Sequence, residues 1–168
     1  MTIFIGPRAA AGIQPFKAHG DGIVQAAYGS YEVTINPVAA DTYELCKVPA
    51  GAVLLSGMFY CDDLDTGTEV MDFDLGWKAN GGSLTHDSID ADGLANLGIL
   101  LGDVAAPNLA TAVGLIYGLY GPIFGDGDFP KFSRETVIQA TANVAANSFT
   151  AGAISAVVYY VVDDSIVA

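Results

Sequence analysis

The chain has 168 residues, of which 52% are hydrophobic and only 15% charged, and its formal net charge at pH 7 is −13. This length accommodates one domain with a hydrophobic core. The acidic balance argues against nucleic-acid binding, because affinity for phosphate comes largely from Lys and Arg. Typical soluble domains carry roughly 25% charged residues, so the sequence predicts apolar surface that other subunits cover.

The first thirty residues are rich in glycine and proline and show no sustained hydrophobic period. We therefore expect residues 1–30 to form an extended N-terminal arm in front of a single domain at residues 31–168. Residues 1–20 contain Arg8 and Lys17 but no acidic residue. A basic arm on an acidic body is suited to docking on a neighbouring subunit, so Arg8 and Lys17 are candidate interface residues.

The N-terminus and the cysteines both indicate a reducing compartment. The apolar run Ile3–Ile5 is too short for a secretion signal, and Arg8 follows it instead of preceding it. Cys46 and Cys61 lie unevenly about the turn at Pro49–Gly51, which argues against a disulfide between them. The sequence therefore predicts two buried free thiols and folding in the cytoplasm.

Two short strands are predicted after the arm. Regular structure is expected to begin at Tyr31–Ile35, where apolar and polar residues alternate. A second strand is predicted at Thr42–Val48, and the turn at Pro49–Gly51 ends it.

A hairpin is predicted next, from the runs Ala52–Tyr60 and Glu69–Trp77 joined by a loop rich in Asp. In the second run, the odd-numbered residues must face the core, since a slip by one residue would bury Asp72 and Asp74. The predicted core residues are Met71, Phe73, Leu75 and Trp77.

The hydrophobic period then changes toward that of a helix. Ser88 is a candidate N-cap, and leucines recur at helical spacing up to Asp103. Gly93 and Gly98 weaken this pattern. We expect a short helical insertion near residues 88–120.

The stretch Val104–Gly125 has no charged residue and is long enough to span a bilayer. However, it contains Pro107, Pro122 and several glycines, and neither Lys nor Arg flanks it to set an orientation. We therefore predict no contact with a membrane.

Two further strands are predicted at Glu135–Ala142 and Ala153–Val162. The last is apolar on both faces, so the domain itself or a partner chain should cover both. Tyr159 and Tyr160 point to opposite faces of it, and both are candidate interface residues. The whole pattern predicts a mainly β domain, an antiparallel two-sheet sandwich or jelly roll with a short helical insertion.

The tripeptide Asp65-Thr66-Gly67 is that of the aspartic proteases, in which two such aspartates share a proton and activate water. With one copy, this chain would have to act as a dimer. In that family, apolar strand residues precede the catalytic aspartate, whereas Asp62 and Asp63 precede it here. We favour a structural turn and predict no enzymatic activity, with a dimeric protease using Asp65 as an alternative.

Acidic residues gather in two loops, where a calcium site is one interpretation. They are Asp62, Asp63, Asp65, Glu69, Asp126 and Asp128. Their spacing does not fit an EF-hand, because Thr68 stands where glycine is required. His19 and His86 have no second His or Cys at the spacing of zinc ligands. We predict solvated turns, with neither a metal nor another cofactor.

Three segments share a pattern of strands and turns. Val48–Leu55 holds a Pro-Ala-Gly turn before a long strand, Asp62–Gly67 is an Asp-rich turn, and Met71–Gly76 ends in Leu-Gly. The pattern resembles that of tailed-bacteriophage virion proteins over residues 31–80 and, more vaguely, in the final strand. The resemblance implies a jelly-roll subunit, above all a capsid cement or decoration protein, often trimeric.

The composition is compatible with this implication. A cement protein needs apolar contacts and no active site, and a net charge of −13 is repelled by packaged DNA, which favours the exterior of the capsid. The expected partners are copies of the chain in a homotrimer and the major capsid protein or other virion proteins, with assembly in the host cytoplasm. A receptor- or glycan-binding jelly roll of the virion is a further alternative, because exposed aromatic side chains serve either role.

Overall fold

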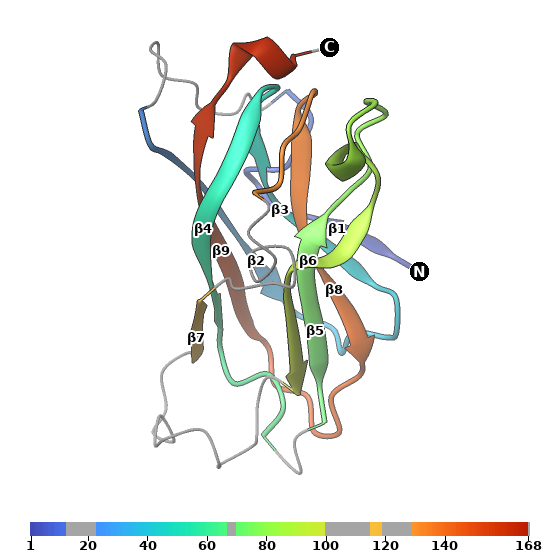
Figure 1. Ribbon diagram of the computed structural model, residues 1–168. Coiled ribbons are helices and arrows are strands. Elements are labelled where there is room, and N and C mark those ends of the chain that lie inside the picture. The colour runs from blue at the N-terminus through green and yellow to red at the C-terminus, as the bar shows by residue number, and fades with distance from the viewer. Residues whose placement is uncertain (13–22, 67–69, 100–114, 119–128, 168) are drawn as a thin grey trace.

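The computed structural model describes residues 1–12, 23–66, 70–99, 115–118 and 129–167. They form two β-sheets that pack face to face (Figure 1). The five-stranded sheet contains, in spatial order, β1 (Ile3–Ile5), β3 (Thr42–Val48), β8 (Thr136–Val144), β5 (Asp72–Trp77) and β6 (Asp90–Ile99). The four-stranded sheet contains, in spatial order, β2 (Gln25–Val33), β9 (Gly152–Val162), β4 (Ala52–Cys61) and β7 (Leu115–Gly118). Two 3-10 turns, η1 (Thr85–Asp87) and η2 (Asp164–Ile166), complete the described elements.

From β2 to β9 successive strands alternate between the two sheets, except that β5 and β6 both lie in the five-stranded sheet. All of their pairings are antiparallel. β1 is an addition at one edge, where it pairs parallel with β3. This connectivity is that of a jelly roll. The prediction of a mainly β, two-sheet sandwich or jelly roll is therefore confirmed.

The core lies between the sheets and is built from the inward-facing side chains of both. Met71 and the three odd-numbered residues of β5 have no exposed surface, as the alternating pattern predicted. In β9, buried residues alternate with half-buried ones along the whole strand. The strand predicted at Thr42–Val48 has the same bounds in the structure, and β9 differs from its prediction by one residue.

The predicted hairpin is wrong. β4 pairs with β9 and β7, whereas β5 pairs with β8 and β6 in the opposite sheet. The acidic loop between them therefore passes from one sheet to the other. Each strand is apolar on its inward face, and their placement in different sheets lets both bury that face across the same core.

The predicted helix is also wrong where the structure describes it. Residues 90–99 form β6, which pairs with β5 at the edge of the sheet. Glycine is required at one of these positions, because a Cβ on Gly93 would lie 2.4 Å from the ring of Trp77. The rest of the predicted insertion lies outside the described residues, except for β7. Among the described residues, no helix is long and apolar enough to cross a bilayer.

The N-terminal segment contributes to both sheets, so the prediction that regular structure begins at Tyr31 is wrong. β2 already pairs with β9 from Gln25 onward. The carboxylate of Asp41 holds β1 in place, since its Oδ1 accepts the backbone N–H of Thr2 at 2.7 Å. The N–H of Gly6 then donates to the carbonyl oxygen of Glu44 at 2.6 Å. Residues 13–22 lie outside the described residues.

Candidate interface surface

The outward side of the four-stranded sheet forms a continuous uncharged surface, which we call the outer face. It arises because every second residue of β2, β9 and β4 points away from the core. Its side chains are Ala26, Tyr28 and Ser30 from β2, Ala153, Ser155, Val157, Tyr159 and Val161 from β9, and Val53, Ser56, Met58 and Tyr60 from β4.

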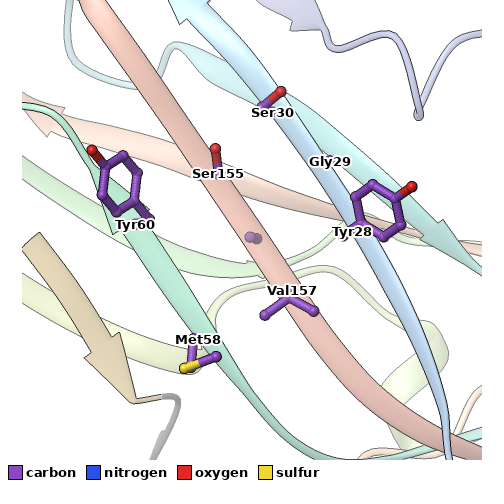
Figure 2. Close-up of a pocket in the computed structure, with 8 residues that line it drawn as sticks. Tyr28, Gly29, Ser30, Met58, Tyr60, Ser155 and Val157 are labelled. Carbon is purple, nitrogen blue, oxygen red and sulfur yellow. The ribbon is translucent and has the colours of Figure 1, made fainter. Parts of the chain in front are cut away.

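The pairing register arranges these side chains in rows across the strands. Tyr28, Val157 and Met58 form one row, and Ser30, Ser155 and Tyr60 form the next. Figure 2 shows both rows on the same side of the sheet. A shallow hollow of about 330 Å³ lies between them, and it is lined mainly by carbon atoms. Tyr28 and Met58 are 57% and 42% exposed, which is unusual for large apolar side chains in a strand.

Hydrogen bonds hold both tyrosines that flank the hollow. The hydroxyl of Tyr60 donates to Oδ1 of Asp62 at 2.8 Å, and this bond raises the pKa of Tyr60. Arg8 donates from its guanidinium to the hydroxyl of Tyr28 at 2.7 Å and also lies over that ring, 4.7 Å from its centroid. Because both rings are fixed before any partner arrives, they lose little conformational entropy on binding. The outer face is therefore a surface whose two exposed tyrosines are held in place within the chain.

The predicted interface residues fall in different places. Arg8 lies at the β2 edge of the outer face and Tyr159 lies on the face itself. Tyr160 has no exposed surface and belongs to the core, so its assignment to an interface is wrong. Lys17 lies outside the described residues.

Sequence reasoning missed most of the outer face. Tyr28 falls in the segment assigned to the arm, and Met58 and Tyr60 were read as part of a hairpin. The available signal was the period of two in Ala52–Tyr60, which places Met58 and Tyr60 on one side of the strand.

Asp65 has a structural role in this fold. It has no exposed surface, and its carboxylate accepts four backbone N–H groups, those of Val70, Met71, Asn147 and Ser148, at 2.8–3.3 Å. Burial alone would raise the pKa of Asp65, but these donors outweigh it and the pKa lies below its ordinary value. A catalytic dyad needs an aspartate that shares a proton and contacts water. The geometry of Asp65 opposes both requirements.

The acidic residues of the first loop likewise bind the protein's own backbone. Oδ2 of Asp62 accepts the N–H of Ala153 at 2.8 Å, beside the bond from Tyr60. Within the described part of the chain, no three His, Cys, Asp or Glu residues are placed to hold a metal ion. Glu69, Asp126 and Asp128 lie outside it.

Asp87 is a second buried carboxylate with a full set of donors. It accepts from Asn80, from the N–H of Leu84 and from both the N–H and the hydroxyl of Ser133, at 2.6–3.0 Å. Burial opposes ionisation here too, but the donors lower the pKa of Asp87 below its ordinary value. This aspartate ties η1 to the segment before β8.

The remaining candidates are also structural. Nδ1 of His86 accepts the N–H of Lys131 at 3.3 Å, and its ring packs edge-on against Trp77. His19 lies outside the described residues. Cys46 and Cys61 are buried free thiols, as predicted, and burial raises the pKa of each to about 12.

No protein-family model matches the chain, and no curated protein matches its sequence. Solved structures with the same fold do match. A chain in the capsid of Ralstonia phage GP4 is 19% identical, with a TM-score of 0.61 over 96% of this chain and 99% of that one. A chain in the capsid asymmetric unit of cyanophage Pam1 is 20% identical, with a TM-score of 0.58 over 92% and 94%.

A chain in the acidic stable capsid structure of Helicobacter pylori bacteriophage KHP30 is 13% identical, with a TM-score of 0.55 over 84% of this chain and 90% of that one. In all three comparisons the likeness spans nearly the whole of both chains, which excludes a match to one shared motif. Over most of its length, the chain therefore has the fold of a chain found in phage capsid structures.

Proposed function

We propose that the chain is a non-enzymatic structural subunit of a phage particle, and more specifically a capsid cement or decoration protein that stabilises the head shell through subunit contacts. The observation that carries the proposal is the likeness of fold, over nearly the full length, to chains of phage capsids. The low sequence identity between this chain and those capsid chains is common among proteins that keep a fold while their surfaces change.

The distribution of charge supports a place on the capsid exterior. A body with a net charge of −13 is repelled by packaged DNA. The uncharged outer face offers a surface on which such a body can approach another subunit without bringing like charges together. Its Tyr and Met side chains, with Arg8 at the edge, are residue types that are enriched in protein interfaces, where Lys, Glu and Asp are depleted.

The proposed partners follow from the same features. They are further copies of the chain and the major capsid protein or other virion proteins, joined in the host cytoplasm during assembly. A neutral glycan that stacks on Tyr28 and Tyr60 is the alternative ligand of the same surface, since aromatic rings and the hydroxyls of Ser30 and Ser155 suit a sugar.

Quantitative mass spectrometry of purified particles tests the proposal. We expect the chain in a copy number comparable to that of the major capsid protein. A few copies per particle would indicate a tail or portal component and overturn the cement role, and absence from particles would overturn the proposal as a whole.

A second experiment separates stabilisation from mere presence. Particles assembled without the chain are heated with and without the recombinant protein, and DNA release is followed by dye fluorescence. We expect the added chain to raise the release temperature. Binding to a glycan array without binding to particles would instead favour the receptor-binding alternative.

A further inference from the structure

Two opposite charges flank the outer face on its β2 side. Arg8 lies over Tyr28, and Glu32 is exposed four residues further along the same side of the strand. Within the described part of the chain, the two ion pairs are Lys47–Glu135 and Lys78–Glu44, and neither Arg8 nor Glu32 takes part in one.

The two charges are too far apart to pair within one chain. Four residues of extended strand span about 13 Å, which exceeds the Debye length of about 8 Å at physiological salt. Arg8 uses one nitrogen for the hydroxyl of Tyr28, so its other donors remain free for a carboxylate. Among the described residues, therefore, neither charge has an ion-pair partner, and a second molecule could supply one.

Their spacing is self-complementary. A second copy can stack on the outer face about a two-fold axis that lies between the two faces, perpendicular to the strands, at the row of Ser30 and Ser155. The strands of the second copy then run in the opposite direction. The row of Tyr28 in each copy lies over the row of Glu32 in the other. A two-fold contact repeats each interaction, so one arrangement satisfies both charges of both copies.

We propose that the outer face binds a second copy of this chain, with Arg8 of each copy paired to Glu32 of the other. This inference rests on the proposed function and adds to it, because it names the partner that the outer face binds. Ser30, Ser155 and Tyr60 lie at the centre of the contact, on the axis. Met58 and Val157 lie in the next row, and the two ion pairs lie at the β2 edge. Since each copy carries a net charge of −13, this uncharged surface is where two copies meet with the least repulsion.

The size of the surface sets the expected strength. With the axis at Ser155, the rows of Tyr28, Ser30 and Glu32 overlap in the two copies over about 20 Å, and three strands lie about 5 Å apart, so each copy buries roughly 300 Å². This is below the usual 800 Å² or so per partner of a stable complex, and a dissociation constant in the micromolar range is expected. A face that packs on its own copy requires two-fold symmetry, so the trimer implied by the resemblance would have to use other surfaces.

Charge reversal tests the pairing. Sedimentation equilibrium across micromolar concentrations measures the dimer constant of the full chain and of Arg8→Glu, Glu32→Arg and the double variant. Each single reversal should weaken dimerisation about tenfold or more, and the double reversal should restore it to within about threefold, as expected for a directly coupled pair. The matched control reverses an ion pair on the other sheet, Lys47→Glu with Glu135→Lys, and should leave the dimer unchanged.

Two outcomes would overturn the proposal: a chain that stays monomeric throughout, or single reversals that the double variant does not rescue. Ser155→Asp gives an independent check, because Ser155 lies on the two-fold axis, where the new carboxylates of the two copies would meet and should abolish the dimer whatever the ion pairs contribute. A monomeric chain that is nevertheless abundant in particles would refute the dimer and leave the virion role intact. A chain that dimerises but is absent from particles would refute the virion role and leave the dimer intact.

Discussion

The two sheets of the sandwich share one core but present opposite chemistry to the outside. The outward side of the five-stranded sheet carries Glu44, Gln139 and Asp74, which are at most 8% exposed. Two ion pairs, Lys78–Glu44 and Lys47–Glu135, bring the exposed charges of Lys78 and Glu135 to the surface. The outer face of the four-stranded sheet has no charged side chain between Arg8 and Glu32. The acidic residues that dominate the composition are therefore kept off one surface.

This difference shows how a strand separates folding from recognition. Because side chains alternate, the inward positions of β9 can satisfy the core while the outward positions vary independently. Apolar residues on the outer face are then not required by the core, and the proposed contact with another molecule gives a physical reason for them.

Two neighbouring tyrosines give the sharpest test of this separation. Tyr160→Ala removes a fully buried ring and should lower the free energy of unfolding by about 3–5 kcal/mol. Tyr159→Ala removes a half-buried ring from the outer face and should cost less than about 1 kcal/mol. Urea denaturation measures both effects. Equal losses of stability would show that the outer face belongs to the fold and not to an interface.

Asp65→Asn should have the next largest effect. An amide nitrogen in place of one carboxylate oxygen cannot accept the N–H groups that bind there, and the charge that strengthens the other bonds is lost. We expect the free energy of unfolding to fall by about 2–3 kcal/mol, as measured by denaturation in urea. The dimer constant of the folded fraction should stay the same, because Asp65 lies in a loop and not on the outer face.

The sequence was sufficient for the strands whose pattern depends only on local chemistry. The alternation of Phe73, Leu75 and Trp77 and the polar ends of Thr42–Val48 correctly gave strands and inward faces. What it could not give was which strand pairs with which. The loop around Asp65 has the residues of a hairpin turn, yet its carboxylate binds backbone from the distant segment at Asn147 and Ser148, and this tertiary contact is invisible in the local pattern.

The error at β6 has a related cause. Leucines at a spacing of three and four residues satisfy a helical period, but a short apolar run is also compatible with a strand. Here the free edge of β5 decided the outcome, since it offers hydrogen bonds that only a strand can complete. Of the predicted interface residues that the structure describes, Arg8 and Tyr159 lie at the outer face. Both placements follow from local properties, because a charged side chain is usually exposed and the alternation along a strand fixes the face to which Tyr159 points.

Asp74 and Asp87 should respond to pH in opposite directions. Burial raises the pKa of Asp74, and the nearby Asp72 and Asp92 add to the rise although Asn143 donates to it. A raised pKa means that the folded state binds more protons, so stability falls as pH rises from about 3.9, the ordinary value, through the folded pKa. Asp87 has a lowered pKa, and its contribution is present above about pH 4 and is lost as pH falls through the folded value.

The corresponding variant is Asp74→Asn, which removes a disfavoured charge and keeps an oxygen for Asn143. We expect it to stabilise the protein by about 1 kcal/mol at pH 7 and to have no such effect near pH 3. Urea denaturation of the variant and the wild type at both values measures this. Destabilisation at pH 7 would mean that the ionised carboxylate of Asp74 is needed by the fold.

The smallest effect is expected from the ion pair of the five-stranded sheet. Lys47 and Glu135 lie 3.1 Å apart, but the side chain of Glu135 is 41% exposed, and solvent screens the attraction. Lys47→Gln should therefore change the free energy of unfolding by about 0.5 kcal/mol or less, and added salt should reduce even that.

The comparison with Arg8→Gln is informative because Arg8 has no ion-pair partner within the described chain. If charges on this sheet serve solubility and the charge at the outer face serves contact, Lys47→Gln should leave the dimer intact, whereas Arg8→Gln should weaken it at similar stability. Equal effects of the two variants on the dimer would mean that the contact depends on overall charge and not on the face on which a charge lies.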